Sequence, residues 1–472
     1  MSGMDATFLY FETPSMHMHV LGTLVLDPTD IPGGWNRDRV HRLLRERLDL
    51  IPPFRRRLLQ PTLRLHHPVW TDVEDIDLHD HITTVTCRAP GNEAQLEELL
   101  GGFAAEKLPR DRPLFHILVV EGLAKGRVAV VIKVHHCAVD GVGAARILGN
   151  LFDLEATGRT PESLEQARAM VAATAPSSEP GIPALALHTA MGLASRPLGV
   201  AKMVPAVAKS AVNLVMSRRA KGSGTSGAIP FTAPRASFNG TISPDRVVAL
   251  VDVPLDDIKA VKNAVGGTFN DAVIAICGGA FRRYLDARGE LPDSSLIAVV
   301  PVSVRSDDDN QAANRTSAMF TSLGTDIADP LERLESVRNA NDIGKADQKA
   351  LGDELVVQAA ELASPNITSL IARLYSTARL ADLHPVVHNV VISNVAGPPI
   401  QIYFAGAKVE RMFPLGPVLE GPGLNITVVS YRDRVGFGLI ACKQRMPDVA
   451  ELAAQVAPAL DELLQAAKAT AS

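Results

Sequence analysis

A run of β-branched residues that ends in two adjacent histidines constrains the fold most strongly. Residues 128–134 read Val-Ala-Val-Val-Ile-Lys-Val, and His135 and His136 follow directly, with Asp140-Gly141 a few positions later. β-Branched side chains favour strands, and an Asp-Gly pair favours a turn. The pattern predicts a buried strand that carries histidines at its end. Histidine is the side chain best suited to proton transfer near neutral pH, so a catalytic base is expected here.

Strand alternation predicts different surroundings for the two histidines. If residues 127–136 form one strand, its even positions are apolar apart from His136. His135 shares the other, mixed face with Arg127 and Lys133. Because successive side chains point to opposite faces, we predict that His136 points inward and that burial keeps its imidazole neutral. The simplest alternative is a pair of hydrogen-bonded structural histidines at a strand end.

Asp140 and Gly141 have more than one interpretation. Asp140 either orients an imidazole or holds the turn, by capping the next helix or by pairing with an arginine, and we favour the structural role. Gly141 lacks a Cβ, so backbone or substrate can approach it closely. Both residues are therefore predicted to support the base.

Metal binding and thiol catalysis explain the segment less well. Adjacent histidines on a strand diverge, and no third ligand is near in sequence. The pairs His66-His67 and His79/His81 lie in a polar, proline-broken region and are predicted to be surface residues. Cys137 follows the histidine pair, but neighbours in a strand do not face each other, so it is not expected to be a nucleophile.

The composition indicates a globular protein of two or more domains. The chain has 472 residues, which exceeds one ordinary hydrophobic core. A net charge of −5, scattered basic residues and 4% aromatic residues do not predict nucleic-acid binding. The four separated cysteines form no CxxC pair, which fits a reducing compartment. Neither a signal peptide nor a membrane-spanning run is recognised, so we expect a cytoplasmic protein that meets membranes only from the surface.

Strand and helix patterns mix in both halves, which predicts two α/β layers of similar size. The predicted boundaries are residues 1–156, 157–236 and 237–472. The middle part is rich in Ala, Pro and Ser, and residues 184–216 are apolar on most faces. They either cover the main body or contact lipid with basic residues at the rim, and we favour the cover. The expected strands are residues 20–26, 115–121, 127–134, 247–253, 296–304, 387–393, 424–431 and 435–441, and the expected helices are 39–50, 93–107, 141–154, 255–264, 269–288, 450–467 and several between 330 and 381.

These residues resemble a known family. The segment 135–141 is similar to the HHxxxDG motif of the chloramphenicol-acetyltransferase-like acyltransferases, which condensation enzymes share. Further segments narrow the resemblance to the bacterial wax ester synthase/acyl-CoA:diacylglycerol acyltransferase family, and their order covers nearly the whole chain. They are residues 5–9, 18–20, 53–58, 112–115 (with Phe115 where the family has Trp), Asn270-Asp271, 301–305, 393–398 and 423–426.

The resemblance implies an α/β fold with two chloramphenicol-acetyltransferase-like domains, each a mixed sheet with helices, around a central tunnel. Acyl-CoA is expected at one mouth and the alcohol at the other. His136 falls on the family's catalytic histidine. Asn270 maps onto a second site element, where its amide donates to the oxyanion or the acyl group. Asn and Asp also favour an ordinary helix start, so both roles stay open for Asn270.

The implied reaction is acyl transfer from long-chain acyl-CoA to an alcohol. Diacylglycerol gives triacylglycerol and a long-chain alcohol gives a wax ester, with acyl-CoA as a substrate and with no cofactor or metal. A peripheral membrane or lipid-droplet surface fits such apolar acceptors, on the inner face of the membrane. Two alternatives remain: a polyketide- or peptide-linked condensing enzyme, although no carrier domain is fused, and a non-catalytic lipid-binding or droplet protein, for which an inward base would have no use.

Overall fold

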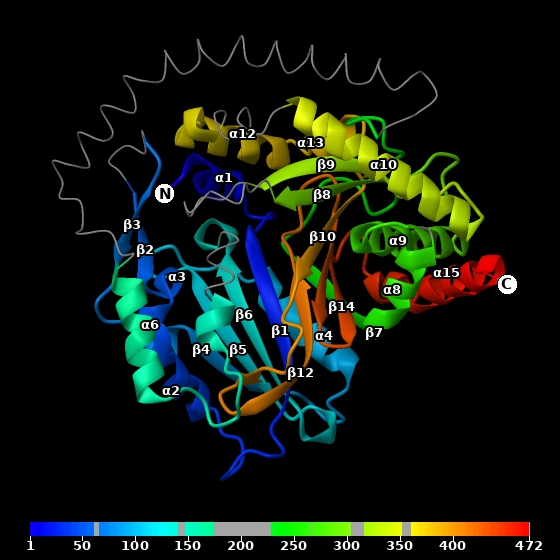
Figure 1. The fold of residues 1–472 in the computed structure, drawn as a ribbon. Coiled ribbons are helices and arrows are strands. Elements are labelled where there is room, and N and C mark those ends of the chain that lie inside the picture. The colour runs from blue at the N-terminus through cyan, green and yellow to red at the C-terminus, as the bar shows by residue number, and fades with distance from the viewer. Residues whose placement is uncertain are drawn as a thin grey trace.

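Two six-stranded sheets form the framework of the chain in a computed structural model (Figure 1). Helices from both halves of the sequence pack on these sheets, which confirms the predicted mixed α/β class. The structure describes residues 1–60, 66–139, 147–173, 228–264, 266–303, 316–351 and 360–471.

The first sheet combines strands from both ends of the sequence, in the order β11-β12-β1-β6-β5-β4. β1 pairs antiparallel with β6 on one side and with β12 on the other. The sheet therefore contains chain from both predicted acyltransferase domains. Its strands are β1 (His19–Asp27), β4 (Ile82–Thr86), β5 (Phe115–Glu121), β6 (Val128–His135), β11 (Tyr403–Phe404) and β12 (Ala407–Leu415).

β6, at the centre of this sheet, is buried on both faces. All eight of its residues are buried. Its even-numbered residues pack in the core of the first half. Ala129 and Val131 face the other way, into a cluster that also holds residues of α4 (Glu93–Ala105) and β7 (Arg246–Pro254). Because side chains alternate along a strand, β6 joins the core of its own half to the contact between the halves.

The second sheet has the order β7-β14-β13-β10-β8-β9. Its largest apolar core lies between the sheet and a layer of helices that includes α8, α9 and α15 (Figure 1). The other strands are β8 (Ile297–Ser303), β9 (Thr316–Ser322), β10 (Val390–Ala396), β13 (Leu424–Tyr431) and β14 (Arg434–Cys442). The helices are α8 (Leu255–Ala264), α9 (Phe269–Asp286), α10 (Pro330–Leu351), α14 (Val449–Ala453) and α15 (Val456–Ala471).

The N-terminal helix α1 (Gly3–Phe11) connects the end of β6 to two later helices. It packs against α12 (Pro365–Thr377) and against the 3₁₀ turn η5 (His136–Ala138), and α12 in turn contacts α13 (Leu380–Leu383). The remaining elements are α2 (Asp38–Arg47), η1 (Leu48–Leu50), α3 (Pro52–Arg55), β2 (Arg56–Leu59), β3 (Val69–Asp72), η3 (Leu78–Asp80), η4 (Ala124–Gly126) and α6 (Pro161–Ala173).

The elements with the strongest hydrophobic patterns occur where the sequence predicts them. The expected strands at 115–121 and 247–253 are β5 and β7, and the expected helix at 269–288 is α9. The helix predicted at 141–154 is described only from residue 147, where the chain is helical to residue 151. α1, β4, β9 and β12 were not predicted. β12 carries three charged residues among nine, so its extended form depends on pairing with β1.

Two expectations concern membranes. Over the described ranges, no single helix is long and apolar enough to cross a bilayer. α8 and α9 reach that length and composition only together, as a pair bent by 100°. The apolar stretch 184–216, predicted to cover the body or contact lipid, lies outside the described residues.

Candidate active site

The two adjacent histidines belong to different elements. β6 ends at His135, and His136 opens the turn η5. The backbone N–H of His136 donates to the carbonyl of Met18 at 2.7 Å, and that of His135 donates to Leu114 at 3.0 Å. The prediction that strand alternation orients His136 is therefore wrong, because the strand stops one residue earlier. The turn sets the direction of this side chain.

The ring of His136 is held in a defined place and is neutral. It stacks on Phe8 of α1, with ring centroids 4.0 Å apart and planes 15° apart. Burial, with a smaller contribution from His135, lowers the pKa of His136 from 6.5 to about 4. Its Nδ1 is buried, and no other residue in the described part of the chain is hydrogen-bonded to it. A neutral imidazole with a free nitrogen can accept a proton from a bound hydroxyl.

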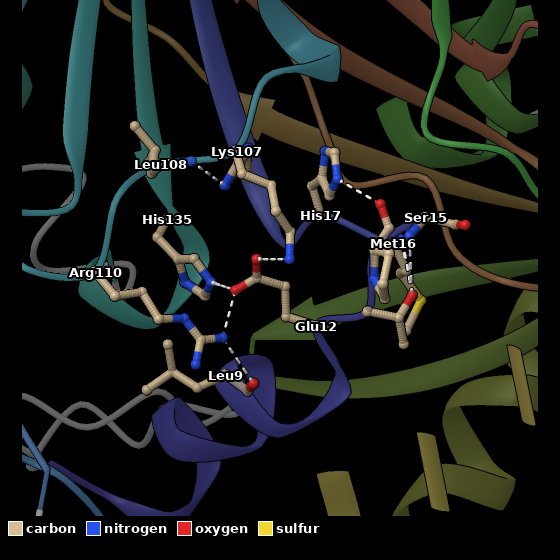
Figure 2. Close-up of polar contacts among 12 residues, drawn as sticks. Leu9, Glu12, Ser15, Met16, His17, Lys107, Leu108, Arg110 and His135 are labelled. Carbon is tan, nitrogen blue, oxygen red and sulfur yellow. Dashed lines mark hydrogen bonds and ion pairs between the residues drawn. The ribbon is translucent and has the colours of Figure 1, made fainter. Parts of the chain in front are cut away.

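His135, in contrast, is fully engaged in the fold (Figure 2). Its Nδ1 accepts a hydrogen bond from the backbone N–H of Cys137 at 3.1 Å. The proton must therefore sit on Nε2, which donates to Oε2 of Glu12 at 3.3 Å. Burial outweighs this carboxylate and lowers the pKa of His135 below 6.5. With both nitrogens occupied, His135 anchors the end of β6 beside the candidate base.

Glu12 is the buried centre of a charge cluster that the sequence did not predict (Figure 2). Its carboxylate is 3% exposed, and it accepts from Lys107 Nζ at 2.8 Å and Arg110 Nη2 at 2.5 Å. Burial alone would raise the pKa of Glu12, but the hydrogen bond from His135 and the charge of Arg110 hold that pKa far below its usual value of 4.5. The carboxylate is therefore ionised throughout the physiological range.

The cluster joins three separate parts of the sequence. Glu12 follows α1, Lys107 and Arg110 follow α4, and His135 ends β6. The motifs that resemble the family lie on either side of Glu12, in residues 5–9 and 18–20, and do not include it. A lone carboxylate in a mostly apolar stretch was the signal available in the sequence.

His19 extends the buried polar network next to this cluster. It lies opposite His135 in the register of β1 and β6, and the two rings meet edge to face at 5.7 Å. The backbone N–H of Leu108 donates to His19 Nε2 at 3.4 Å. Burial lowers the pKa of His19 well below 6.5, so this ring is neutral too. The end of the first sheet thus contains adjoining neutral imidazoles.

The structure describes Cys137 but not the predicted supporting residues Asp140 and Gly141. Cys137 is buried, and burial raises the pKa of its thiol well above 9.0, so no thiolate nucleophile forms. Asp140 and Gly141 lie outside the described residues, and their supporting roles stay predictions.

Asn270 and Asp271 begin helix α9, as an Asn-Asp pair at a helix start predicts. Thr268 caps the helix, and Asp271 returns a hydrogen bond by accepting from the Thr268 N–H at 2.8 Å. The other carboxylate oxygen of Asp271 accepts from Asn341 at 2.6 Å. Asn270 is partly buried, and no hydrogen bond or ring contact between described residues joins it to His136. Asp271 therefore has a structural role, whereas the amide of Asn270 has no hydrogen bond to the other described residues of this cap.

The other histidine pairs are less exposed than predicted. His67 is 3% exposed and its Nδ1 lies 2.6 Å from the hydroxyl of Tyr10. His81 is 2% exposed and stacks on Phe115. The prediction of surface positions is wrong for these two, because tertiary packing covers a segment that reads as polar; His79 is exposed as predicted. Over the described ranges, no group of three or more His, Cys, Asp or Glu residues is arranged to hold a metal ion.

Comparison with known proteins gives matches along the chain. The wax ester synthase/diacylglycerol acyltransferase catalytic domain matches residues 1–273, and the WS/DGAT C-terminal domain matches residues 312–464. A candidate diacylglycerol O-acyltransferase of Mycobacterium tuberculosis is 36% identical over 466 residues, which are 98% of this chain and 90% of that protein. Another from the same species is 33% identical over 476 residues, covering 100% of this chain and 98% of that protein.

Solved structures agree with these matches. The wax ester synthase/diacylglycerol acyltransferase from Marinobacter aquaeolei VT8 has a TM-score of 0.67 at 26% identity, over 98% of both chains. The first condensation domain of the calcium-dependent antibiotic synthetase has a TM-score of 0.53 at 16% identity, over 99% of this chain and 95% of that one, and shares the fold alone. The motif-based resemblance is confirmed: the chain belongs to the wax ester synthase/diacylglycerol acyltransferase family.

Proposed function

We propose that this acyltransferase moves a long-chain acyl group from acyl-CoA to the hydroxyl of diacylglycerol or of a long-chain alcohol, with His136 as general base. The observation that carries the proposal is the state of the His136 ring: it is neutral, is held against Phe8, and has a buried nitrogen to which no other described residue is hydrogen-bonded. The names of the relatives supply the class of substrates. Neither a lipid-binding role nor a carrier-linked condensing role is favoured by any observation.

The proposed reaction needs one base and no covalent intermediate. A ring nitrogen of His136 takes the acceptor's hydroxyl proton while the oxygen attacks the thioester carbonyl, whose electron pair moves onto its oxygen. The tetrahedral intermediate then collapses, the C–S bond breaks, and the histidinium returns its proton to the departing sulfur. A thiol has a pKa of about 8.5, so the leaving group needs no strong acid. The protonated Cys137 thiol agrees with a direct transfer.

The Glu12 cluster supports this chemistry without taking part in it. It holds His135, whose backbone N–H and ring fix the chain at the point where β6 passes into η5. His136 is the next residue, so its place depends on this anchor. Holding a catalytic group in a defined position is a large part of what an enzyme contributes.

Asn270 is proposed as a donor to the developing oxyanion, and two neighbouring substitutions separate this role from helix capping. Asn270→Ala should lower kcat by about a hundredfold, the effect of losing one such donor, with little change in stability. Asp271→Asn should lower the free energy of unfolding by about 1–2 kcal/mol through the damaged cap, with kcat nearly retained. Steady-state kinetics and urea unfolding of both variants measure this. Unchanged kcat in Asn270→Ala would restrict Asn270 to the helix start.

The acceptor class is tested with a panel of alcohols. Purified full-length protein is given radiolabelled palmitoyl-CoA with diacylglycerol, hexadecanol or a sterol, and the lipid products are separated by thin-layer chromatography. We expect labelled triacylglycerol or wax ester, with release of one free thiol for each ester formed. Free thiol without ester would indicate hydrolysis. If no ester and no free thiol form with any acceptor, the proposed transfer is overturned and lipid binding is favoured.

Peripheral contact with a membrane or lipid-droplet surface is part of the proposal. Both acceptors are apolar and gather in such surfaces, so an enzyme that uses them gains from docking there.

A further inference from the structure

Helix α12 presents its apolar face to solvent. Four aliphatic side chains spaced one helical turn apart line this face and are more than half exposed: Ile367 (61%), Leu370 (57%), Ile371 (61%) and Leu374 (55%). Residues spaced by three and four positions share one side of a helix. Globular proteins normally turn such a stripe toward the core. This helix is therefore inverted relative to an ordinary surface helix.

The opposite face of α12 is already attached to the body of the protein. Pro365 and Ala372 are buried. Ser376 donates to Glu420 at 2.6 Å, and the hydroxyl of Tyr375 meets His384. The polar side thus faces inward through specific hydrogen bonds, so rotation of the helix could not hide the apolar stripe without breaking them. The short helix α13 continues the apolar surface with Leu383, which is 77% exposed.

Positive charge borders the apolar stripe. Within residues 365–379 the charged residues are Arg373 and Arg379, both exposed. At α13, Arg379 and Arg445 share the carboxylate of Asp382. Arg235 adds a further positive charge, because its described hydrogen bonds go to backbone carbonyls, at 2.6 Å to that of His384. These four arginines outnumber the carboxylates of Asp382, Glu361 and Glu420 around α12 and α13.

The apolar stripe lies one helix away from the candidate base. α1 packs against α12, and its Phe8 stacks on His136. The N-terminus of α1 is also tied to the chain just before α12, because the N–H of Gly3 donates to Glu361 at 2.6 Å. A Cβ at Gly3 would lie 2.6 Å from the backbone of Ala360, so this contact requires glycine. Figure 1 shows α1, α12 and α13 together at one end of the molecule.

We propose that α12 and α13 form the face through which the protein docks on an anionic lipid surface. An exposed aliphatic stripe with a cationic rim is the signature of a helix that lies in the plane of a membrane interface. The apolar side chains would enter the acyl region while the arginines meet anionic headgroups. Docking in this orientation would bring the candidate active site close to the layer that holds the acceptors, a benefit that rests on the proposed function.

Flotation of the full-length protein with vesicles tests the docking face. The probes are vesicles of phosphatidylcholine with about one third phosphatidylglycerol, and vesicles of phosphatidylcholine alone. We expect wild type to float with the anionic vesicles and more weakly with the neutral ones. The double variant Ile371→Gln/Leu374→Gln should lose about tenfold or more of its affinity, since it removes two of the inserted side chains. Arg373→Gln should reduce binding to anionic vesicles only.

The matched control is the double variant Leu154→Gln/Met170→Gln, which changes two side chains of similar exposure, 70% and 74%, away from α12. It should bind as wild type does. The proposal fails if wild type does not bind either vesicle, or if the α12 variant still binds within twofold. It also fails if sedimentation shows that wild type is a dimer which the α12 variant converts to monomers, because a second copy would then cover this face.

Activity separates this proposal from the proposed function. With an acceptor dispersed in detergent, the α12 variant should transfer acyl groups as wild type does. With the same acceptor in vesicles, its rate should fall with its binding. If wild type binds vesicles through α12 but makes no ester with any acceptor, the docking face is supported and the proposed acyl-transfer function is wrong. Equal rates of wild type and the α12 variant on vesicle-borne acceptor would remove the link between docking and catalysis.

Discussion

His136→Ala is expected to lower kcat/KM for acyl transfer by about a hundred- to ten-thousand-fold, the usual contribution of a positioned general base. The ring is neutral because burial lowers its pKa to about 4, and its Nδ1 has no partner among the described residues. Among its described sequence neighbours, His135 has both ring nitrogens engaged and the Cys137 thiol stays protonated, so neither takes over as base. The measurement is initial-rate kinetics with acyl-CoA and the acceptor that the panel identifies.

The control for this prediction is His79→Ala. His79 is exposed and lies in η3, away from the end of β6, so its loss should change the rate less than twofold. Circular dichroism and thermal unfolding of both variants show whether the fold is kept. A folded His136→Ala protein with near wild-type kcat/KM would show that His136 is not the base.

Glu12→Gln is expected to lower the free energy of unfolding by about 3 kcal/mol, at the lower end of what breaking a buried ion pair costs. The substitution removes the carboxylate charge that pairs with Lys107 and Arg110, and it weakens the bond from His135. The two cations are 44% and 39% exposed and can turn toward water, which limits the loss. Urea unfolding of wild type and variant measures the difference.

The dependence of this difference on pH gives a second readout. The pKa of Glu12 is lowered on folding, so its ionised form stabilises the fold fully above about pH 4.5, the value in the unfolded chain. Below that pH the unfolded chain binds a proton that the folded protein does not, and the stabilisation is lost. The difference in the free energy of unfolding between wild type and Glu12→Gln should therefore become smaller as the pH falls below 4.5.

Glu93→Gln is the matched control for Glu12→Gln. Glu93 also pairs with an arginine, Arg411, at 2.9 Å, but its side chain is 43% exposed. Breaking such a surface pair should cost at most about 1 kcal/mol. If both variants lost the same free energy of unfolding, burial of the Glu12 carboxylate would contribute nothing to stability. Because Glu12 holds His135, its variant should also lower kcat, whereas the Glu93 variant should not.

Local patterns in the sequence predicted the main elements of the fold and a candidate position for the site. The apolar run of β6, the β13 and β14 pair and the Asn-Asp start of α9 each have a preference that neighbours in sequence determine. The histidine pair at the end of a buried strand followed from the same reasoning. Ordered motifs along the chain were sufficient to indicate the family, which the comparisons confirm.

The sequence by itself determined which segments form strands and helices and which histidines follow a buried strand, because hydrophobic period and turn residues act over a few positions. Only the tertiary structure decided the rest. β12 completes a sheet with β1 from the other end of the chain, and Glu12, Lys107 and Arg110 meet at His135 from three segments. The outward apolar face of α12 depends on inward hydrogen bonds. Contacts between distant segments depend on how whole elements pack, which no local pattern encodes.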